Sequence, residues 1–268
     1  MAKRKKATGS HKSGQMLVGE RHQHILHVIQ TDGRALVDDL SDSLGISRIT
    51  IRKDLEYLQS KGLIERTHGG ALPIQHGTLA DPTLKEKEKQ HQAEKLRIAT
   101  AAAKLVQEGQ CVMLDSGTTT MALTRVLKRF ESLTVITNAV NIAAELVGTN
   151  LEVILTGGTL RKNSFSLVGP LAEDVLREMH ADILFLGVDG FDVESGPSTP
   201  NVLESRVNRQ MVETAKRVVV VCDSTKFVRR SLARIVPTTS IHHVITDKAL
   251  PHATAEALRA QNIEVTLV

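Results

Sequence analysis

The sequence predicts an α/β protein in which an N-terminal winged helix-turn-helix precedes a C-terminal domain built on a mostly parallel sheet. Short helical periods over residues 20–61 are followed by a stretch typical of a β-hairpin at 62–71. From Glu94 onward, short β-branched runs alternate with helical stretches, as in a parallel sheet covered by helices. Apolar residues make up 41% of the 268, which is enough for packed cores.

Changes in composition divide the chain into four segments. Residues 1–18 are polar and basic and predict a disordered arm, and residues 19–72 hold the winged helix-turn-helix. Residues 73–93 combine Pro, Gly and charge with little apolar content, which predicts a linker leading into a solvated helix. Residues 94–268 form the α/β domain.

The third helix of the first domain has the features of a DNA recognition helix. A tight turn at 45–47 precedes it, and Ser47 is a suitable N-cap. Ile51, Leu55 and Leu58 form one apolar stripe at helical spacing. Five side chains near the helix start lie off that stripe and could meet base edges or phosphates in a major groove: Ser47, Arg48, Thr50, Arg52 and Lys53.

The hairpin after this helix predicts a wing that contacts DNA through Arg66 and His68. The net charge of +4 supports this interpretation, because residues 1–72 hold twelve Lys and Arg against eight Asp and Glu, while the remainder is balanced. The alternatives are a basic tail that serves only solubility and a helical bundle with an ordinary charged surface. Aromatic residues, at 2%, are too few for a protein that stacks single-stranded bases.

Seven strands and six helices are expected in the second domain. The strands are 111–115, 133–137, 151–156, 182–189, 217–223, 242–247 and 263–268. The helices lie near 94–107, 119–130, 139–147, 170–179, 201–215 and 253–261.

Polar residues follow several of these strands, and ligands of parallel sheets bind at the carboxyl ends of strands. The turn from Asp115 to Thr120 joins a strand to a helix N-terminus, where free N–H groups and hydroxyls favour a phosphate. A plain capped turn is the alternative for this segment. The candidate ligand-binding residues are Asp115, Ser116, Gly117, Thr118, Thr119, Thr137, Asn138, Gly157, Gly158, Asp189, Glu204 and Lys226.

Motifs in both domains resemble the DeoR family of sugar-responsive repressors. The DNA-binding motifs are T-I-R-x-D-L at 50–55 and R-x-H-G-G-A at 66–71. The sensor motifs are L-D-S-G-T-T-T (114–120), T-N (137–138), T-G-G (156–158), L-G-V-D (186–189) and D-S-T-K-F (223–227). Residues 156–173 and 223–235 look most like the N-acetylgalactosamine-type repressors of that family. The resemblance implies a regulator whose C-terminal domain binds a phosphorylated sugar.

The sensor domain of that family is similar to ribose-5-phosphate isomerase, which raises an alternative as an enzyme. Residues 189–192 resemble the acidic motif of the isomerase, and Glu204 resembles its general base. The loop at 193–203 contains no Lys where the isomerase uses one, so a developing enediolate would lack a cation. We therefore expect no catalytic residues and no cofactor.

Cysteine, histidine and leader patterns add little. Cys111 and Cys222 lie in apolar runs and predict two separate buried thiols, and no histidine pair has a third ligand for a metal. The start MAKRKK lacks the apolar segment of a signal peptide, and no apolar run is long enough for a membrane span, so a cytoplasmic protein is expected.

The sequence therefore predicts a repressor of a carbohydrate catabolism operon. The expected partners are double-stranded operator DNA, a phosphorylated sugar or amino-sugar effector, and further copies of the chain in a dimer or tetramer. Two other hypotheses stay open: a sugar-phosphate isomerase and a DNA-binding protein that responds to no ligand.

Overall fold

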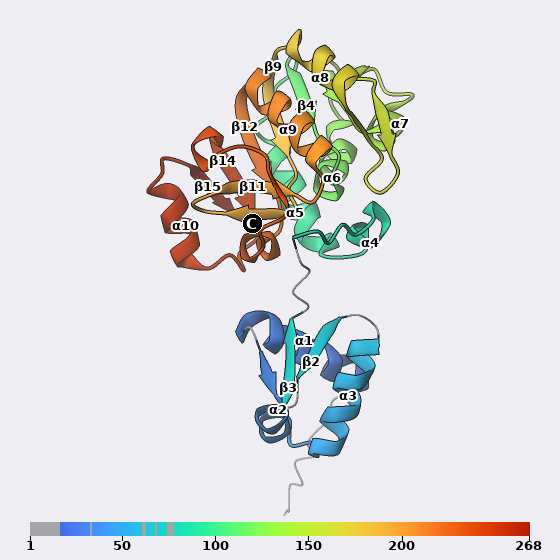
Figure 1. Ribbon diagram of the computed structural model, residues 1–268. Helices are drawn as coiled ribbons and strands as arrows, with labels where there is room; N and C mark the ends of the chain where they lie inside the picture. The colour runs from blue at the N-terminus through green and yellow to red at the C-terminus, as the bar shows by residue number, and fades with distance from the viewer. Residues whose placement is uncertain (1–16, 33, 61–62, 68, 74–77) are drawn as a thin grey trace, which may run out of the picture. The chain divides into compact units, whose positions relative to one another are not determined.

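A computed structural model describes residues 17–32, 34–60, 63–67, 69–73 and 78–268 (Figure 1). Its internal contacts divide the chain into two units, residues 1–76 and 77–268, and each is described by itself. The arm expected at 1–18 lies outside the described residues except for its last two positions.

The N-terminal unit is a winged helix-turn-helix, as the sequence predicts. A three-stranded antiparallel sheet, in the order β1-β3-β2, packs with three helices. The helices are α1 (Val18–Asp32), α2 (Val37–Leu44) and α3 (Arg48–Ser60), and the strands are β1 (Ala35–Leu36), β2 (Ile64–Thr67) and β3 (Gly70–Pro73).

The turn between α2 and α3 is built by local hydrogen bonds. Gly45 ends α2 in the left-handed conformation, with φ of 64°, which glycine adopts at little cost. The Ser41 hydroxyl donates to the carbonyl of Ile46 at 2.7 Å. Ser47 begins the next helix, since its Oγ accepts a hydrogen bond from the backbone N–H of Thr50 at 3.2 Å.

Apolar residues from all three helices form the core of this unit. Ile25, Ile51, Leu55 and Leu58 are each at most 1% exposed, and the last three are the stripe that the sequence predicts on α3. Burying one face of α3 in this way fixes which of its residues face outward.

An ion pair lies beside that core. Arg21 donates to both carboxylate oxygens of Asp54, at 2.6 and 2.8 Å, and His22 Nε2 lies 3.0 Å from Oδ1. Burial by itself would raise the pKa of Asp54, but the hydrogen bonds from Arg21 and His22 outweigh it and hold that pKa below its usual value. The pair fastens α1 to the buried side of α3.

The C-terminal unit contains a seven-stranded sheet in which all neighbouring strands are parallel. All seven expected strands form it, in the spatial order β15-β14-β12-β9-β4-β5-β6. Their bounds are β4 (Cys111–Leu114), β5 (Thr134–Thr137), β6 (Glu152–Leu155), β9 (Ala181–Leu186), β12 (Ala215–Val221), β14 (His243–Thr246) and β15 (Glu264–Leu267).

Helices cover both faces of this sheet (Figure 1), as the sequence predicts. Val112 and Leu114 of β4 face one core, and Met113 between them faces the other. One face is covered by α5 (Gln92–Ala103), α6 (Thr118–Leu127) and α7 (Val140–Leu146). The other is covered by α8 (Pro170–Arg177), α9 (Val202–Thr214) and α10 (His252–Arg259).

Shorter elements surround the carboxyl edge of the sheet. Two antiparallel arrangements occur, the hairpin β7-β8 and the small sheet β10-β11-β13. These strands are β7 (Thr159–Arg161), β8 (Ser166–Val168), β10 (Gly190–Asp192), β11 (Gly196–Thr199) and β13 (Ala233–Arg234). The remaining elements are α4 (Leu84–Glu88) and the 3₁₀ turns η1 (Ser224–Val228) and η2 (Thr238–Ser240).

The segment 73–93, expected to be a linker leading into a solvated helix, is helical in its second half and is attached to the C-terminal unit there. Residues 84–88 form α4, which begins with a capping box between Thr83 and Glu86. The Leu84 N–H donates to the carbonyl of Asn163 at 2.7 Å, which attaches this helix to the C-terminal unit. Charge in this stretch predicted solvent exposure, but two of its charged residues, Asp81 and Lys87, pair with partners in the fold. Residues 74–77 lie outside the described part of the chain.

The Asp54 ion pair gives a test of the N-terminal unit. Asp54→Ala leaves the guanidinium of Arg21, whose side chain is 11% exposed, without its partner, so the unfolding free energy of this unit should fall by about 1–3 kcal/mol. Tyr57 is the only tyrosine and tryptophan is absent, so tyrosine fluorescence in urea reports this unit in the full chain. Asp42→Ala, at an exposed position of α2, is the control, and equal unfolding midpoints for the two variants would contradict the assignment.

Candidate functional site

The outward side of α3 presents most of the side chains that the sequence predicts for DNA contact. Arg48, Arg52 and Lys53 are exposed, and Thr50 is half-buried with its hydroxyl 2.9 Å from that of Ser47. Arg48 also forms a solvent-exposed ion pair with Asp38, in which its Nε lies 2.9 Å from Oδ1. An exposed pair of this kind contributes little stability, so a phosphate could replace Asp38 at small cost.

The wing is less open than the sequence suggests. Arg66 on β2 is half-buried, and its Nη1 donates to the Glu56 carboxylate of α3 at 2.9 Å. A DNA contact by Arg66 would therefore require it to leave or share Glu56. His68, the second expected wing residue, lies outside the described residues.

Sequence reasoning missed one exposed residue on α3. Ile49 is 67% exposed at the helix start, next to the cationic side chains. The available signal was an apolar residue that falls off the stripe of Ile51, Leu55 and Leu58. An apolar side chain at this place is suited to contact the methyl group of thymine.

A pocket in the C-terminal unit lies at the point where the strand order reverses. From β4 the chain builds β5 and β6 on one side, and then returns to place β9 against the other side of β4. The helices that follow the two strands therefore diverge and leave a crevice at their carboxyl ends, the usual ligand position in such sheets. We call this crevice the switch-point pocket. Eight of the twelve expected ligand residues line it: Asp115, Ser116, Gly117, Thr118, Thr119, Asp189, Glu204 and Lys226.

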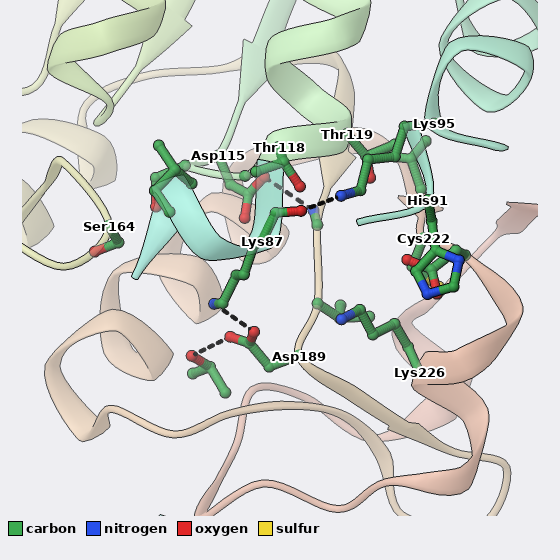
Figure 2. Close-up of a pocket in the computed structure, with 18 of the residues that line it drawn as sticks. Lys87, His91, Lys95, Asp115, Thr118, Thr119, Ser164, Asp189, Cys222 and Lys226 are labelled. Atoms are coloured by element: carbon green, nitrogen blue, oxygen red, sulfur yellow. Dashed lines mark hydrogen bonds and ion pairs between the residues drawn. The ribbon is translucent and has the colours of Figure 1, made fainter. Parts of the chain in front are cut away.

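The N-terminus of α6 opens into the switch-point pocket. Gly117 is its N-cap, and in the described part of the chain no side chain accepts a hydrogen bond at this cap. Thr118 and Thr119 line the pocket here (Figure 2), whereas the Thr120 hydroxyl turns back to the carbonyl of Asp115 at 2.9 Å. Uncapped N–H groups and the helix dipole make this end of the pocket a position for an anion.

Basic side chains lie close to that helix end. Lys95, His91 and Lys226 all line the pocket (Figure 2), although only Lys226 was expected from the sequence. The Lys95 ammonium donates to the carbonyls of Lys87 and Gln90, at 2.5 and 2.6 Å. Burial lowers the pKa of Lys95 to about 8, so this group changes charge just above neutral pH.

Carboxylates occupy the rest of the pocket. Asp115 is 2% exposed and accepts a hydrogen bond from the Gly187 N–H at 2.9 Å. Burial, together with the nearby charges of Glu204 and Asp189, raises the pKa of Asp115 to about 8. Asp189 behaves oppositely, because the ion pair with Lys87 at 2.6 Å outweighs its burial and lowers its pKa.

Glu204 is held by several donors at once. Arg161 donates to its Oε1 at 3.0 Å, and the hydroxyls of Ser164 and Ser166 bond to the same oxygen. Thr199 donates to Oε2 at 3.2 Å. A carboxylate whose oxygens are all engaged, and which faces a guanidinium, is poorly suited to remove a proton from a substrate.

Four expected residues do not line the pocket and serve the fold. The Thr137 hydroxyl donates to the carbonyl of Leu114 at 2.8 Å, and fully buried Asn138 donates to the carbonyl of Leu167 at 3.2 Å. Gly157 and Gly158 make the turn from β6 to β7, with φ of 74° and 115°. A Cβ on Gly158 would lie 2.8 Å from the carbonyl oxygen of Val168, so glycine is needed there for close packing.

Sequence reasoning missed the basic residues Lys87, His91 and Lys95, which line the pocket, and Arg161, which pairs with Glu204. Lys87 and His91 lie in the segment expected to be a linker. Lys95 lies on the helix expected near 94–107, to which no ligand contact was assigned. Their recurrence at four-residue spacing, 87, 91 and 95, was the available signal. No sequence pattern indicated Arg161, because it lies in the β7-β8 hairpin, whose position relative to the pocket depends on the tertiary fold.

Within the described residues, no group of three or more His, Cys, Asp or Glu is arranged to hold a metal ion. The two cysteines are free; Cys222 is buried, as expected, whereas Cys111 is only half-buried. None of the described helices has both the length and the apolar character needed to cross a membrane.

Comparison with known proteins gives matches across nearly the whole chain. The family described as the DeoR C-terminal sensor domain matches residues 90–248, and the DeoR-like helix-turn-helix domain matches 21–76. A putative aga operon transcriptional repressor of Escherichia coli O157:H7 is 41% identical over 251 residues, which are 93% of each protein. The regulator GlpR of Haloferax volcanii is also 41% identical, over 93% of this chain and 98% of its own length.

Among solved structures, ribose 5-phosphate isomerase A of Methanocaldococcus jannaschii matches 53% of this chain and 57% of its own. The identity is 19% and the TM-score is 0.39.

The raised pKa of Asp115 gives a pH test. Folded Asp115 keeps its proton up to about pH 8, whereas the unfolded group loses it near pH 4, so this residue makes stability fall as pH rises between those values. Asp115→Asn removes that contribution. The melting temperature of the variant, measured by calorimetry, should therefore rise relative to that of the wild type as the pH increases from 5 to 7.5. The exposed control Asp174→Asn should show no such divergence, and a pH-independent offset for Asp115→Asn would refute the assignment.

Proposed function

Because the chain belongs to the DeoR family of transcriptional regulators, we propose that it represses a carbohydrate catabolism operon and leaves its operator when a phosphorylated sugar binds the switch-point pocket. The observation that carries this proposal is the pocket itself, where an uncapped helix end lies among Lys95, His91 and Lys226. The N-terminal unit supplies the operator contact, and the C-terminal unit supplies the sensor.

Operator binding is assigned to the exposed side of α3. Arg52 and Lys53 project from its first turns, and Arg48 can exchange Asp38 for a phosphate. Arginine reads guanine through two hydrogen bonds, while Ile49 offers an apolar contact for thymine. We assign base readout to Arg52 and phosphate contacts to Arg48 and Lys53.

We assign the two ends of the effector to different parts of the pocket. Its phosphate lies at the α6 N-terminus, against Thr118, Thr119 and the cations Lys95 and Lys226. Its hydroxyl or amino groups lie toward the carboxylates Asp189 and Glu204, which accept hydrogen bonds or pair with an ammonium. A phosphorylated amino sugar satisfies both ends, and the similar Escherichia coli protein named for an aga operon favours the same class.

The proposal includes an assembled form that acts in the cytoplasm, where operator DNA is found. Helix-turn-helix proteins bind paired half-sites as two-fold dimers, so we propose a dimer or a tetramer. The effector prefers the form with lower operator affinity, and the difference in binding free energy is the coupling between the two sites, commonly about 1–3 kcal/mol.

Two other functions are less favoured by specific observations. An isomerase would need Glu204 as a free base, yet Arg161 and three hydroxyls engage it. The relatives described above are named as a repressor and a regulator. A DNA-binding protein without a ligand would have no use for a polar pocket with buried titratable groups such as Lys95 and Asp115.

Arg52→Ala tests the operator assignment. A duplex selected by the protein from a random library should bind the variant about 10 to 100 times more weakly, while binding to an unselected duplex changes much less. Fluorescence anisotropy at two salt concentrations measures both. Arg97→Ala, which removes an exposed arginine of α5, is the control for charge, and equal losses on both duplexes would refute base readout by Arg52.

A panel of hexose and hexosamine phosphates tests the sensor assignment. A true effector raises the melting temperature and releases the selected duplex. Its affinity should fall about tenfold or more from pH 7 to pH 9, since Lys95 loses its positive charge and Asp115 gains a negative one, each near pH 8. Lys95→Met should make this pH profile shallower, leaving the part due to Asp115, and the exposed control Lys104→Met should not. If no sugar phosphate changes operator affinity, the proposed function fails.

A further inference from the structure

The segment 78–91 is tied to the switch-point pocket by two ion pairs. This segment is the first described part of the C-terminal unit and follows the DNA-binding unit in the chain. Asp81 pairs with Arg161 near its start, and Lys87 of α4 pairs with Asp189 near its end. Both ties reach groups at the carboxyl edge of the sheet, where the ligand is proposed to bind.

Lys87 reaches into the pocket and occupies it. Its Nζ lies 2.6 Å from Asp189 Oδ1, with the two side chains 19% and 17% exposed (Figure 2). Its own carbonyl accepts a hydrogen bond from Lys95. A short helix with no buried residue of its own is thus held in place by polar bonds to pocket residues.

Arg161 links the start of the segment to the same set of carboxylates. It bonds to Asp81 on one side and to Glu204 on the other, at 3.0 Å for the latter. The Thr199 hydroxyl lies between the two pocket carboxylates, 3.2 Å from Glu204 Oε2 and 3.3 Å from Asp189 Oδ2. The two ion pairs therefore end on Glu204 and Asp189, and the Thr199 hydroxyl connects these two carboxylates.

These contacts create a conflict with a sugar ligand. The hydroxyl or amino groups of the effector need Asp189 as an acceptor, but in this structure Lys87 already neutralises it. A ligand amine or hydroxyl that takes Asp189 Oδ1 competes with the ammonium of Lys87, which lies 2.6 Å from that oxygen.

We propose that Lys87 is a built-in competitor of the effector and that the segment 78–91 is a latch. With the pocket free of ligand, Lys87 holds the segment in the form that binds the operator. The amino or hydroxyl groups of the effector take Asp189, α4 leaves the pocket edge, and the constraint on the preceding chain is lost. This inference rests on the proposed function and adds to it the residue through which ligand binding is transmitted.

The latch makes two predictions that need no ligand. In the full chain, Lys87→Met keeps side-chain length and helix propensity but removes the charge, so amide hydrogen exchange within 78–91 should accelerate about tenfold or more. Affinity for the library-selected duplex should fall about tenfold, as though effector were present. Lys87→Arg keeps the charge and should retain wild-type behaviour in both measurements.

Lys85→Met is the matched control, since it removes an exposed lysine from the same helix. Asp81→Asn is a second, independent way to release the segment and should change both measurements in the same direction. If the exchange rates of 78–91 and the duplex affinity stay at wild-type values in Lys87→Met and Asp81→Asn, the latch is refuted.

A ligand experiment separates competition from direct binding, with galactosamine 6-phosphate as the probe. Without the Lys87 ammonium, Asp189 is available to the ligand, so the probe should bind Lys87→Met more tightly than wild type in calorimetric titration. Weaker binding to Lys87→Met would show that Lys87 contacts the ligand and would overturn the proposal. If the probe does not bind the wild type, that choice of effector fails, while the ligand-free measurements still decide the latch.

Discussion

The reversal of strand order between β4 and β9 is the constraint on which the C-terminal unit depends. It places the end of β4, with Asp115 and the start of α6, beside the end of β9, with Gly187 and Asp189. The helices that follow these two strands pass to opposite faces of the sheet, so neither helix covers the gap between the strand ends. The pocket is therefore a consequence of topology, and its polar residues follow from the strand ends that meet there.

Charge compensation governs how that pocket can work. Four acidic side chains line it, and desolvation would be costly for each without a partner or a proton. Asp189 has Lys87, Glu204 has Arg161, Asp223 has Lys226 and the Thr225 hydroxyl, and Asp115 retains its proton to about pH 8. In the proposed function, a ligand displaces Lys87 from Asp189 with its own groups. Binding is thereby coupled to whatever the displaced cations hold, which in this chain is the segment that follows the DNA-binding unit.

The N-terminal unit applies a simpler rule. The apolar stripe of α3 and the Asp54 ion pair bury one side of the helix, and this orientation leaves Arg52 and Lys53 outside. The buried residues fix the rotation of the helix and thereby decide which side chains are exposed to a partner. Arg66 shows the limit of this rule, since Glu56 on the same helix draws it back toward the protein surface.

Periodicity alone predicted the helices of the winged helix and the seven strands of the sheet, because burial of alternating or stripe positions is a local property of the sequence. The strand ends likewise indicated Asp115, Thr118, Asp189 and Lys226 as pocket residues. Only the tertiary structure decided that Thr137 and Gly158 serve packing, that Lys87 and Lys95 line the pocket, and that Arg161 pairs with the pocket residue Glu204. The reason is physical: a charged residue has the same local pattern whether it meets water or a carboxylate distant in the chain, and only the fold brings that carboxylate within reach.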